Sequence, residues 1–112
     1  MTTQTMQTTQ DELKLTITHE VQGQGGRYVA HLADSDQSGF LEWEPKEAIR
    51  QDDVRIATHT VVPSEIGGRG VAARLVDQLV SDAREKGFKI VPQCSYVARK
   101  FDENPDWSDL RA

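Results

Sequence analysis

The sequence of 112 residues contains a single cysteine, Cys94, so one chain cannot form an internal disulfide. No second cysteine stands near a histidine at a zinc-finger spacing, and His19 and His31 lack a spacing that suggests a metal site. We therefore expect no bound metal. Cys94 is then either a small buried hydrophobic residue or a reactive thiol.

Long apolar runs and an excess of positive charge are also missing. No window approaches the roughly 20 apolar residues of a transmembrane helix, and the first residues lack the basic and then apolar order of a signal peptide. We expect a soluble protein of the cytoplasm. The 18 acidic residues outnumber 13 Lys and Arg, and the net charge of −5 argues against nucleic acid as a partner. The expected partners include neither nucleic acid nor a membrane.

The length fits one domain. Residues 1–11 are rich in Thr and Gln and show no periodicity, which predicts a disordered tail, while residues 12–112 are expected to form the domain. Alternating apolar and polar residues predict a strand over residues 13–20. Short β-prone runs at 27–32 and 40–44, separated by turn-forming residues, complete an antiparallel meander.

The second half of the chain alternates strand and helix. Residues 54–62 (VRIATHTVV) predict a strand, and an apolar stripe of period 3.6 from Val71 to Ala83 predicts an amphipathic helix. Gly87 suits the C-terminal cap of that helix. Residues 89–91 then predict a strand parallel to the earlier one, because a strand-helix-strand unit forms a right-handed crossover. Residues 95–104 predict a short last helix, so the expected fold is α/β (α+β), a mixed sheet with helices.

The charged residues of the long helix lie outside its apolar stripe. Asp82 and Lys86 belong to this group, and their spacing favours an i, i+4 ion pair.

A glycine-rich turn, residues 67–72 (GGRGVA), lies between a predicted strand and the start of the long helix. Glycines let the backbone approach a ligand closely, and the free N–H groups at a helix start favour an anion. A protein can bind phosphate in this way with few cations. The turn lacks the residues of a Walker A loop and the order of a dinucleotide fingerprint. It is either a phosphate site or simply a tight strand-to-helix turn.

Several short motifs follow one another in a distinctive order: His59-Thr60-Val61-Val62-Pro63, Gly68-Arg69-Gly70 opening a helix, Gly87-x-Lys89, and Pro92-Gln93-Cys94 after the last strand. This order resembles the core of the GNAT superfamily of N-acetyltransferases. The cysteine is similar in position to that of the short Yjdj-type branch, which lacks the early helices of the superfamily. The resemblance spans residues 15–110 and implies a truncated GNAT-like sheet.

The resemblance implies acetyl-CoA as the cofactor. Its diphosphate would bind six residues of the glycine-rich turn, namely Gly67, Gly68, Arg69, Gly70, Val71 and Ala72, and its pantetheine arm would pair with Thr60, Val61 and Val62. The implied activity is transfer of an acetyl group to an amine. The alternative is a module that binds CoA or acetyl-CoA with little or no turnover, since Gly67 stands where the family usually has Arg or Gln, and Lys100 where it usually has Tyr.

The resemblance also implies Cys94 and His59 as the candidate catalytic side chains. His59 is either the base for the amine or a histidine satisfied at a sheet face. Cys94 either carries the acetyl group covalently or is a buried cysteine beside the substrate pocket. Glu42 and Glu44 share one face of their strand, where they either attract a cationic amine or face solvent. The expected partners are acetyl-CoA and a small-molecule or peptide amine, for a monomer or weak homodimer.

Overall fold

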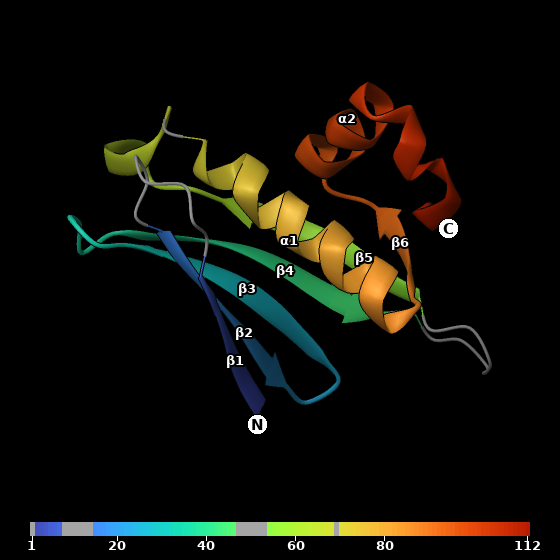
Figure 1. Cartoon of the computed structure of the whole chain (residues 1–112), viewed down its shortest axis with the longest axis horizontal. Helices are drawn as coiled ribbons and strands as arrows, with labels where there is room; N and C mark the ends of the chain where they lie inside the picture. Colours follow the sequence, from blue (N-terminus) through green and yellow to red (C-terminus); the bar gives the residue numbers. More distant parts are fainter. Residues whose placement is uncertain (1, 8–14, 47–53, 69) are drawn as a thin grey trace.

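The computed structural model describes residues 2–7, 15–46, 54–68 and 70–112. Six strands form one sheet in the order β1-β2-β3-β4-β5-β6 (Figure 1). The elements, in chain order, are β1 (Thr2–Gln7), β2 (Leu15–Gln22), β3 (Gly25–Leu32), β4 (Ser38–Pro45), β5 (Val54–Val61), the 3-10 helix η1 (Ser64–Ile66), α1 (Val71–Lys86), β6 (Lys89–Pro92), α2 (Ser95–Glu103) and the 3-10 helix η2 (Pro105–Leu110).

The sheet is mixed, as the sequence predicts. Strands β1 to β5 pair with their neighbours antiparallel, and β6 pairs with β5 parallel. Helix α1 lies across one face of the sheet, where it contacts β3 and β4, while α2 and η2 lie beside β6 (Figure 1). The predicted α/β (α+β) class, with a meander followed by a strand-helix-strand unit, is confirmed.

The predicted disordered tail is wrong for its first part. Residues Thr2–Gln7 form β1, which pairs with β2 over its whole length. Hydrogen bonds to an exposed strand edge can order a polar segment that has no apolar face, and threonine favours extended backbone. The rest of the predicted tail lies outside the described residues, so the domain boundary at residue 12 stays a prediction.

Helix α1 begins and ends at glycines. Gly70 at its N-cap and Gly87 at its C-cap both adopt the left-handed conformation, with φ of 78° and 83°. The N–H of Gly87 donates to the carbonyl of Ala83 at 2.9 Å, which closes the helix as the sequence predicts. The buried apolar face of the helix follows the predicted stripe: Val71, Leu75, Val76, Leu79, Val80 and Ala83.

Asp82 of α1 is buried, although its place outside the apolar stripe suggested an exposed position. Its carboxylate accepts a hydrogen bond from the Tyr28 hydroxyl at 2.6 Å and one from the Gln78 amide at 3.3 Å. These donors offset the loss of water around a buried charge. The predicted pair with Lys86 is present at 3.8 Å. Burial, and then the bond to Asp82, raise the pKa of the Tyr28 hydroxyl, so it keeps its proton and acts as donor.

His19 extends this buried polar cluster across the sheet. Its ring stacks on Tyr28 with centroids 4.2 Å apart, and its Nε2 accepts a hydrogen bond from the Trp43 indole at 3.0 Å. Burial lowers the pKa of His19, which favours the neutral ring that this bond requires. Hydrogen bonds and one ring stack therefore connect α1 to β2, β3 and β4, in addition to apolar packing.

Replacing Asp82 by alanine should lower the free energy of unfolding by about 1 to 3 kcal/mol, because the Tyr28 hydroxyl loses its acceptor inside the protein. Urea denaturation measures this loss. The control is Asp77→Ala on an exposed turn of the same helix, which should change stability by less than about 0.5 kcal/mol. Equal losses in the two variants would contradict the role given to the buried carboxylate.

Candidate active site

Two glycines with left-handed backbone precede the first turn of α1. Gly68 and Gly70 have φ of 76° and 78°, and a Cβ added to either would meet no atom of the described residues within 4 Å. The first turn of α1 carries no acidic side chain, so the positive end of the helix dipole is not neutralised there. Gly67 has ordinary extended backbone, and Arg69 lies outside the described residues. This arrangement suits a phosphate group.

Close packing joins the start of α1 to the end of β5. A Cβ added to Gly39 of β4 would lie 3.1 Å from the Val61 carbonyl and from a methyl of Val62, and 3.4 Å from a methyl of Val71. Glycine at position 39 therefore lets these backbones approach one another. Three of the predicted cofactor-binding residues, Val61, Val62 and Val71, are brought together here, and Ala72 follows in the same helical turn.

Strands β5 and β6 diverge halfway along β5. The parallel ladder covers only Val54–Ala57, and β6 ends at Pro92, whereas β5 continues to Val61. The Cys94 N–H donates to the Ala57 carbonyl at 2.9 Å, and among the described residues this is the last backbone hydrogen bond between the two segments. Beyond it, within the described ranges, no strand pairs with that side of β5. An extended ligand could therefore pair with this free edge as an added strand.

A β-bulge lies where the two strands part. Glu42 of β4 pairs with His59 and Trp43 pairs with Ala57, so Thr58 has no partner of its own. The Thr58 hydroxyl donates to the Glu42 carbonyl at 3.2 Å. Bulges re-aim side chains and are frequent next to active sites. No sequence signal predicts this bulge, because a threonine in a β-prone run looks the same whether or not it is bulged.

Cys94 precedes the first turn of α2 and is half-buried. Its thiol lies 3.6 Å from the Thr60 hydroxyl. Burial alone would raise the pKa of the Cys94 thiol. The Val97 amide, the Thr60 hydroxyl and the amides of Tyr96 and Thr60 together outweigh burial and lower that pKa below its ordinary value. A lowered pKa increases the fraction of thiolate, the nucleophilic form.

The two candidate catalytic side chains lie on opposite faces of β5. His59 pairs with Glu42, and its Nδ1 is 3.5 Å from the Glu42 carboxylate, on the face away from α1. Thr60, the next residue, pairs with the buried Leu41 on the helix face and contacts Cys94 there. The thiol and the imidazole therefore do not form a Cys–His pair. A group bound at the free edge of β5 could be reached by the thiol from one face of the sheet and by the imidazole from the other.

Alkylation of Cys94 by iodoacetamide should reach half its maximal rate at a pH below about 8.5, the ordinary value for cysteine. The pH dependence of the rate constant measures this midpoint. Thr60→Val removes one of the groups that lower the pKa, so its midpoint should move upward. A wild-type midpoint at or above that of a free cysteine would contradict the environment described for the thiol.

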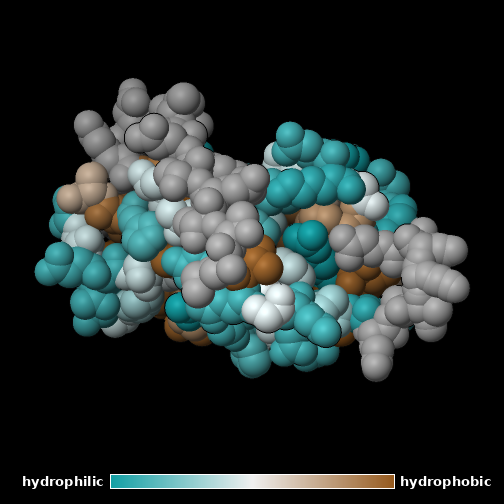
Figure 2. Space-filling model, turned by 90° about the horizontal axis from the view of Figure 1, so that it is seen from below, coloured by the Kyte–Doolittle hydropathy of each residue, from teal (hydrophilic) through white to brown (hydrophobic). Residues whose placement is uncertain are grey.

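Lys100 stands where the family that the sequence resembles usually has Tyr. Lys100 lies on α2 with its Nζ 3.4 Å from the Glu103 carboxylate and 5.7 Å from the centre of the Tyr96 ring. Within residues 2–7, 15–46, 54–68 and 70–112, no group of three metal-ligating side chains occurs and no helix is long and apolar enough to cross a bilayer. The coloured surface in Figure 2 is mostly hydrophilic, with small, separate hydrophobic areas.

Comparison with known families agrees with this geometry. The model of the GCN5-related N-acetyl-transferase family matches residues 27–110. The matched range begins in β3 and ends in η2, and it includes the glycine-rich turn, the bulge and Cys94.

Proposed function

Since the chain belongs to the family of GCN5-related N-acetyltransferases, we propose that it transfers the acetyl group of acetyl-CoA to an amine. The observation that carries the proposal is the open, glycine-rich start of α1 directly beside the free edge of β5. The first feature suits a diphosphate and the second suits an extended amide-bearing arm. Acetyl-CoA contains both groups in that order.

The backbone amides at the start of α1 would hold the diphosphate. The cradle would consist of Gly67, Gly68, Gly70, Val71 and Ala72, with Arg69 between them in the sequence. Because Gly67 stands where the family usually has Arg or Gln, binding would depend mainly on the amides and the helix dipole. The exposed side chain of Val61, 45% accessible, supports an arm that covers the end of β5 at Thr60, Val61 and Val62.

The acetyl group would lie where β5 and β6 part, with Cys94 on the helix face. We assign the first step to the Cys94 thiolate. It attacks the thioester carbonyl, the bond from that carbon to the CoA sulfur breaks, and CoA leaves as a thiolate. The lowered pKa of the Cys94 thiol and its contact with Thr60 support this role.

The amine would complete the transfer from the other face. Its nitrogen attacks the acetyl carbon on Cys94, the carbon–sulfur bond breaks and the Cys94 thiolate is restored. The amine proton passes to His59, which lies on that face beside Glu42. A donor and an acceptor that approach from different faces suit two successive half-reactions, and such reactions give ping-pong kinetics.

The alternative function is coenzyme binding without turnover, favoured by Gly67 and Lys100 at positions where the family usually has Arg or Gln and Tyr. A direct assay separates the two functions. The assay follows release of the CoA thiol, and formation of N-acetylated product, over a panel of primary amines. Thermal melting with CoA is recorded in parallel, since ligand at 100 times its Kd stabilises the fold by about 2.7 kcal/mol. Product formation is the expected result. A thermal shift without product would establish the binding module. The absence of both the thermal shift and the product would overturn both functions.

A further inference from the structure

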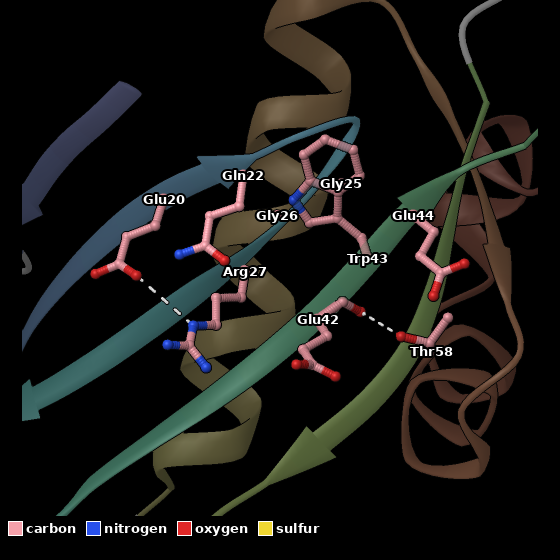
Figure 3. Close-up of a pocket in the computed structure, with 9 residues that line it drawn as sticks. All are labelled: Glu20, Gln22, Gly25, Gly26, Arg27, Glu42, Trp43, Glu44 and Thr58. Carbon is pink, nitrogen blue, oxygen red and sulfur yellow. Dashed lines mark hydrogen bonds and ion pairs between the residues drawn. The ribbon is translucent and has the colours of Figure 1, made fainter. Parts of the chain in front are cut away.

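A hollow of about 240 Å³ lies on the face of the sheet opposite α1 (Figure 3). Side chains from four neighbouring strands border it, including Glu20 of β2, Arg27 of β3, Glu42 and Glu44 of β4, and Thr58 of β5. Figure 3 shows these side chains on the near side of the sheet, with α1 behind it.

A glycine at the start of β3, next to the β2–β3 turn, contributes to the hollow. Gly25 of β3 pairs with Gln22 on one side and packs against the Glu44 backbone on the other. A Cβ at this position would lie 2.7 Å from the Trp43 carbonyl, closer than side chains approach, so the strand spacing requires glycine. The missing side chain leaves space between Gln22 and Glu44. Backbone packing therefore fixes the hollow at Gly25, and side chains of the neighbouring strands form its walls.

The charges around the hollow are unequal. Glu20, Arg27 and Glu42 stand opposite one another on three adjacent strands, and Arg27 Nε lies 3.6 Å from the Glu20 carboxylate. That pair neutralises itself, the Glu42 carboxylate lies 3.5 Å from His59 Nδ1, and Glu44 follows two residues later on β4. Glu42 and Glu44 occupy alternate positions of β4, so their backbones are about 7 Å apart on one face of the sheet. The hollow thus offers two carboxylates at a fixed spacing.

The hollow also adjoins the point where β5 and β6 diverge. Thr58 borders it and is the bulged residue at which β5 becomes free of β6. Glu42 contacts both the Thr58 hydroxyl, through its carbonyl, and His59, through its carboxylate. A ligand in the hollow can therefore contact Glu42, Glu44 and the bulged Thr58.

We propose that this hollow is the acceptor pocket and that the acceptor is a short aliphatic diamine. The distal ammonium lies against Glu44, and the reacting nitrogen lies between Glu42 and Thr58. This inference rests on the proposed function: the reacting nitrogen gives its proton to His59 and forms a bond to the acetyl carbon as the carbon–sulfur bond breaks. A monoamine leaves Glu44 without a partner, and an amino acid places its carboxylate against the acidic wall.

The first test compares kcat/KM for diamines from ethylenediamine to diaminohexane with monoamines of equal length. A diamine should exceed its matched monoamine by about fivefold, as expected for one partly exposed ion pair worth about 1 kcal/mol. Glu44→Gln should abolish this preference by raising the KM for the diamine. The control Glu85→Gln, on the exposed side of α1, should keep it. Equal rates for diamine and monoamine in the wild type would overturn the proposal.

A second test needs neither coenzyme nor turnover, so it separates the pocket from the proposed function. Diaminobutane is titrated into the free protein while backbone amide chemical shifts are followed. The expected changes concentrate at Gly25, Gly26 and Thr58 and are lost in Glu44→Gln. The absence of a saturable change at these amides would overturn the acceptor pocket, even if other amines are acetylated. Saturable binding with no acetylation of any amine would keep the pocket as a diamine site and overturn the proposed function instead.

Discussion

Replacing Gly70 by valine should weaken CoA binding by at least about 100-fold while α1 remains folded. The Cβ of a residue at this position points into the open space in front of the helix start, where the diphosphate is proposed to lie. Each charge-assisted hydrogen bond contributes about 1.5 to 3 kcal/mol, so the loss of two or more accounts for this factor. Calorimetric titration with CoA measures the change.

The control for this prediction is Gly87→Val at the other end of the same helix. Gly87 has nearly the same positive φ, and a Cβ there also meets open space, so both variants bear similar backbone strain. Gly87→Val should therefore lose stability and keep its affinity for CoA. If Gly70→Val binds CoA as tightly as Gly87→Val does, the diphosphate is not held at the start of α1.

Replacing Cys94 by alanine should lower the rate of acetyl transfer by at least roughly 1,000-fold, because the thiolate that receives the acetyl group is removed. The thermal shift caused by CoA should remain, since the thiol is not among the groups that are proposed to bind the diphosphate. Thiol release with the best amine measures the rate. The matched control is Ser95→Ala, the exposed neighbour of Cys94, which should keep nearly full activity.

The same variant decides between covalent and direct transfer. Wild-type protein mixed with acetyl-CoA, without an amine, should gain the mass of one acetyl group on Cys94, and Cys94→Ala should gain none. A rate for Cys94→Ala within threefold of the wild type, with no acetylated wild-type protein, would mean that the amine attacks acetyl-CoA directly. Cys94 would then be a half-buried cysteine next to the site.

The elements that position the site could be predicted because their signals are local. The 3.6-residue stripe and Gly87 predicted α1, and the β-prone run before Pro63 predicted β5. The parallel pairing of β5 and β6 followed from the short helical crossover between them. These elements bring the glycine-rich turn to the end of β5, so a large part of the proposed coenzyme site follows from sequence pattern alone.

The parts that could not be predicted depend on contacts between distant residues. Asp82 looks like a surface carboxylate until Tyr28, 54 positions earlier, is placed beneath it. The bulge at Thr58 depends on the register between β4 and β5, which no short window of sequence contains. The hollow over Gly25 requires three adjacent strands, and β1 requires an available edge of β2. Tertiary pairing decides each of these features.

The positions of His59 and Cys94 relative to each other also could not be predicted from the sequence. Both were predicted as candidate catalytic side chains, and the alternation of β5 separates them onto opposite faces of the sheet. This separation is the structural basis for assigning donor and acceptor to different sides. The predicted monomer or weak homodimer stays a prediction.

Titration of isotope-labelled protein with CoA, followed through backbone amide chemical shifts, tests the central claim most directly. We predict that the largest changes occur at Gly68, Gly70 and Val71. Changes along Thr58 to Val61 should saturate at the same CoA concentration, because one molecule spans both segments. Saturable shifts confined to other parts of the chain, with the amides at the start of α1 unchanged, would contradict the account.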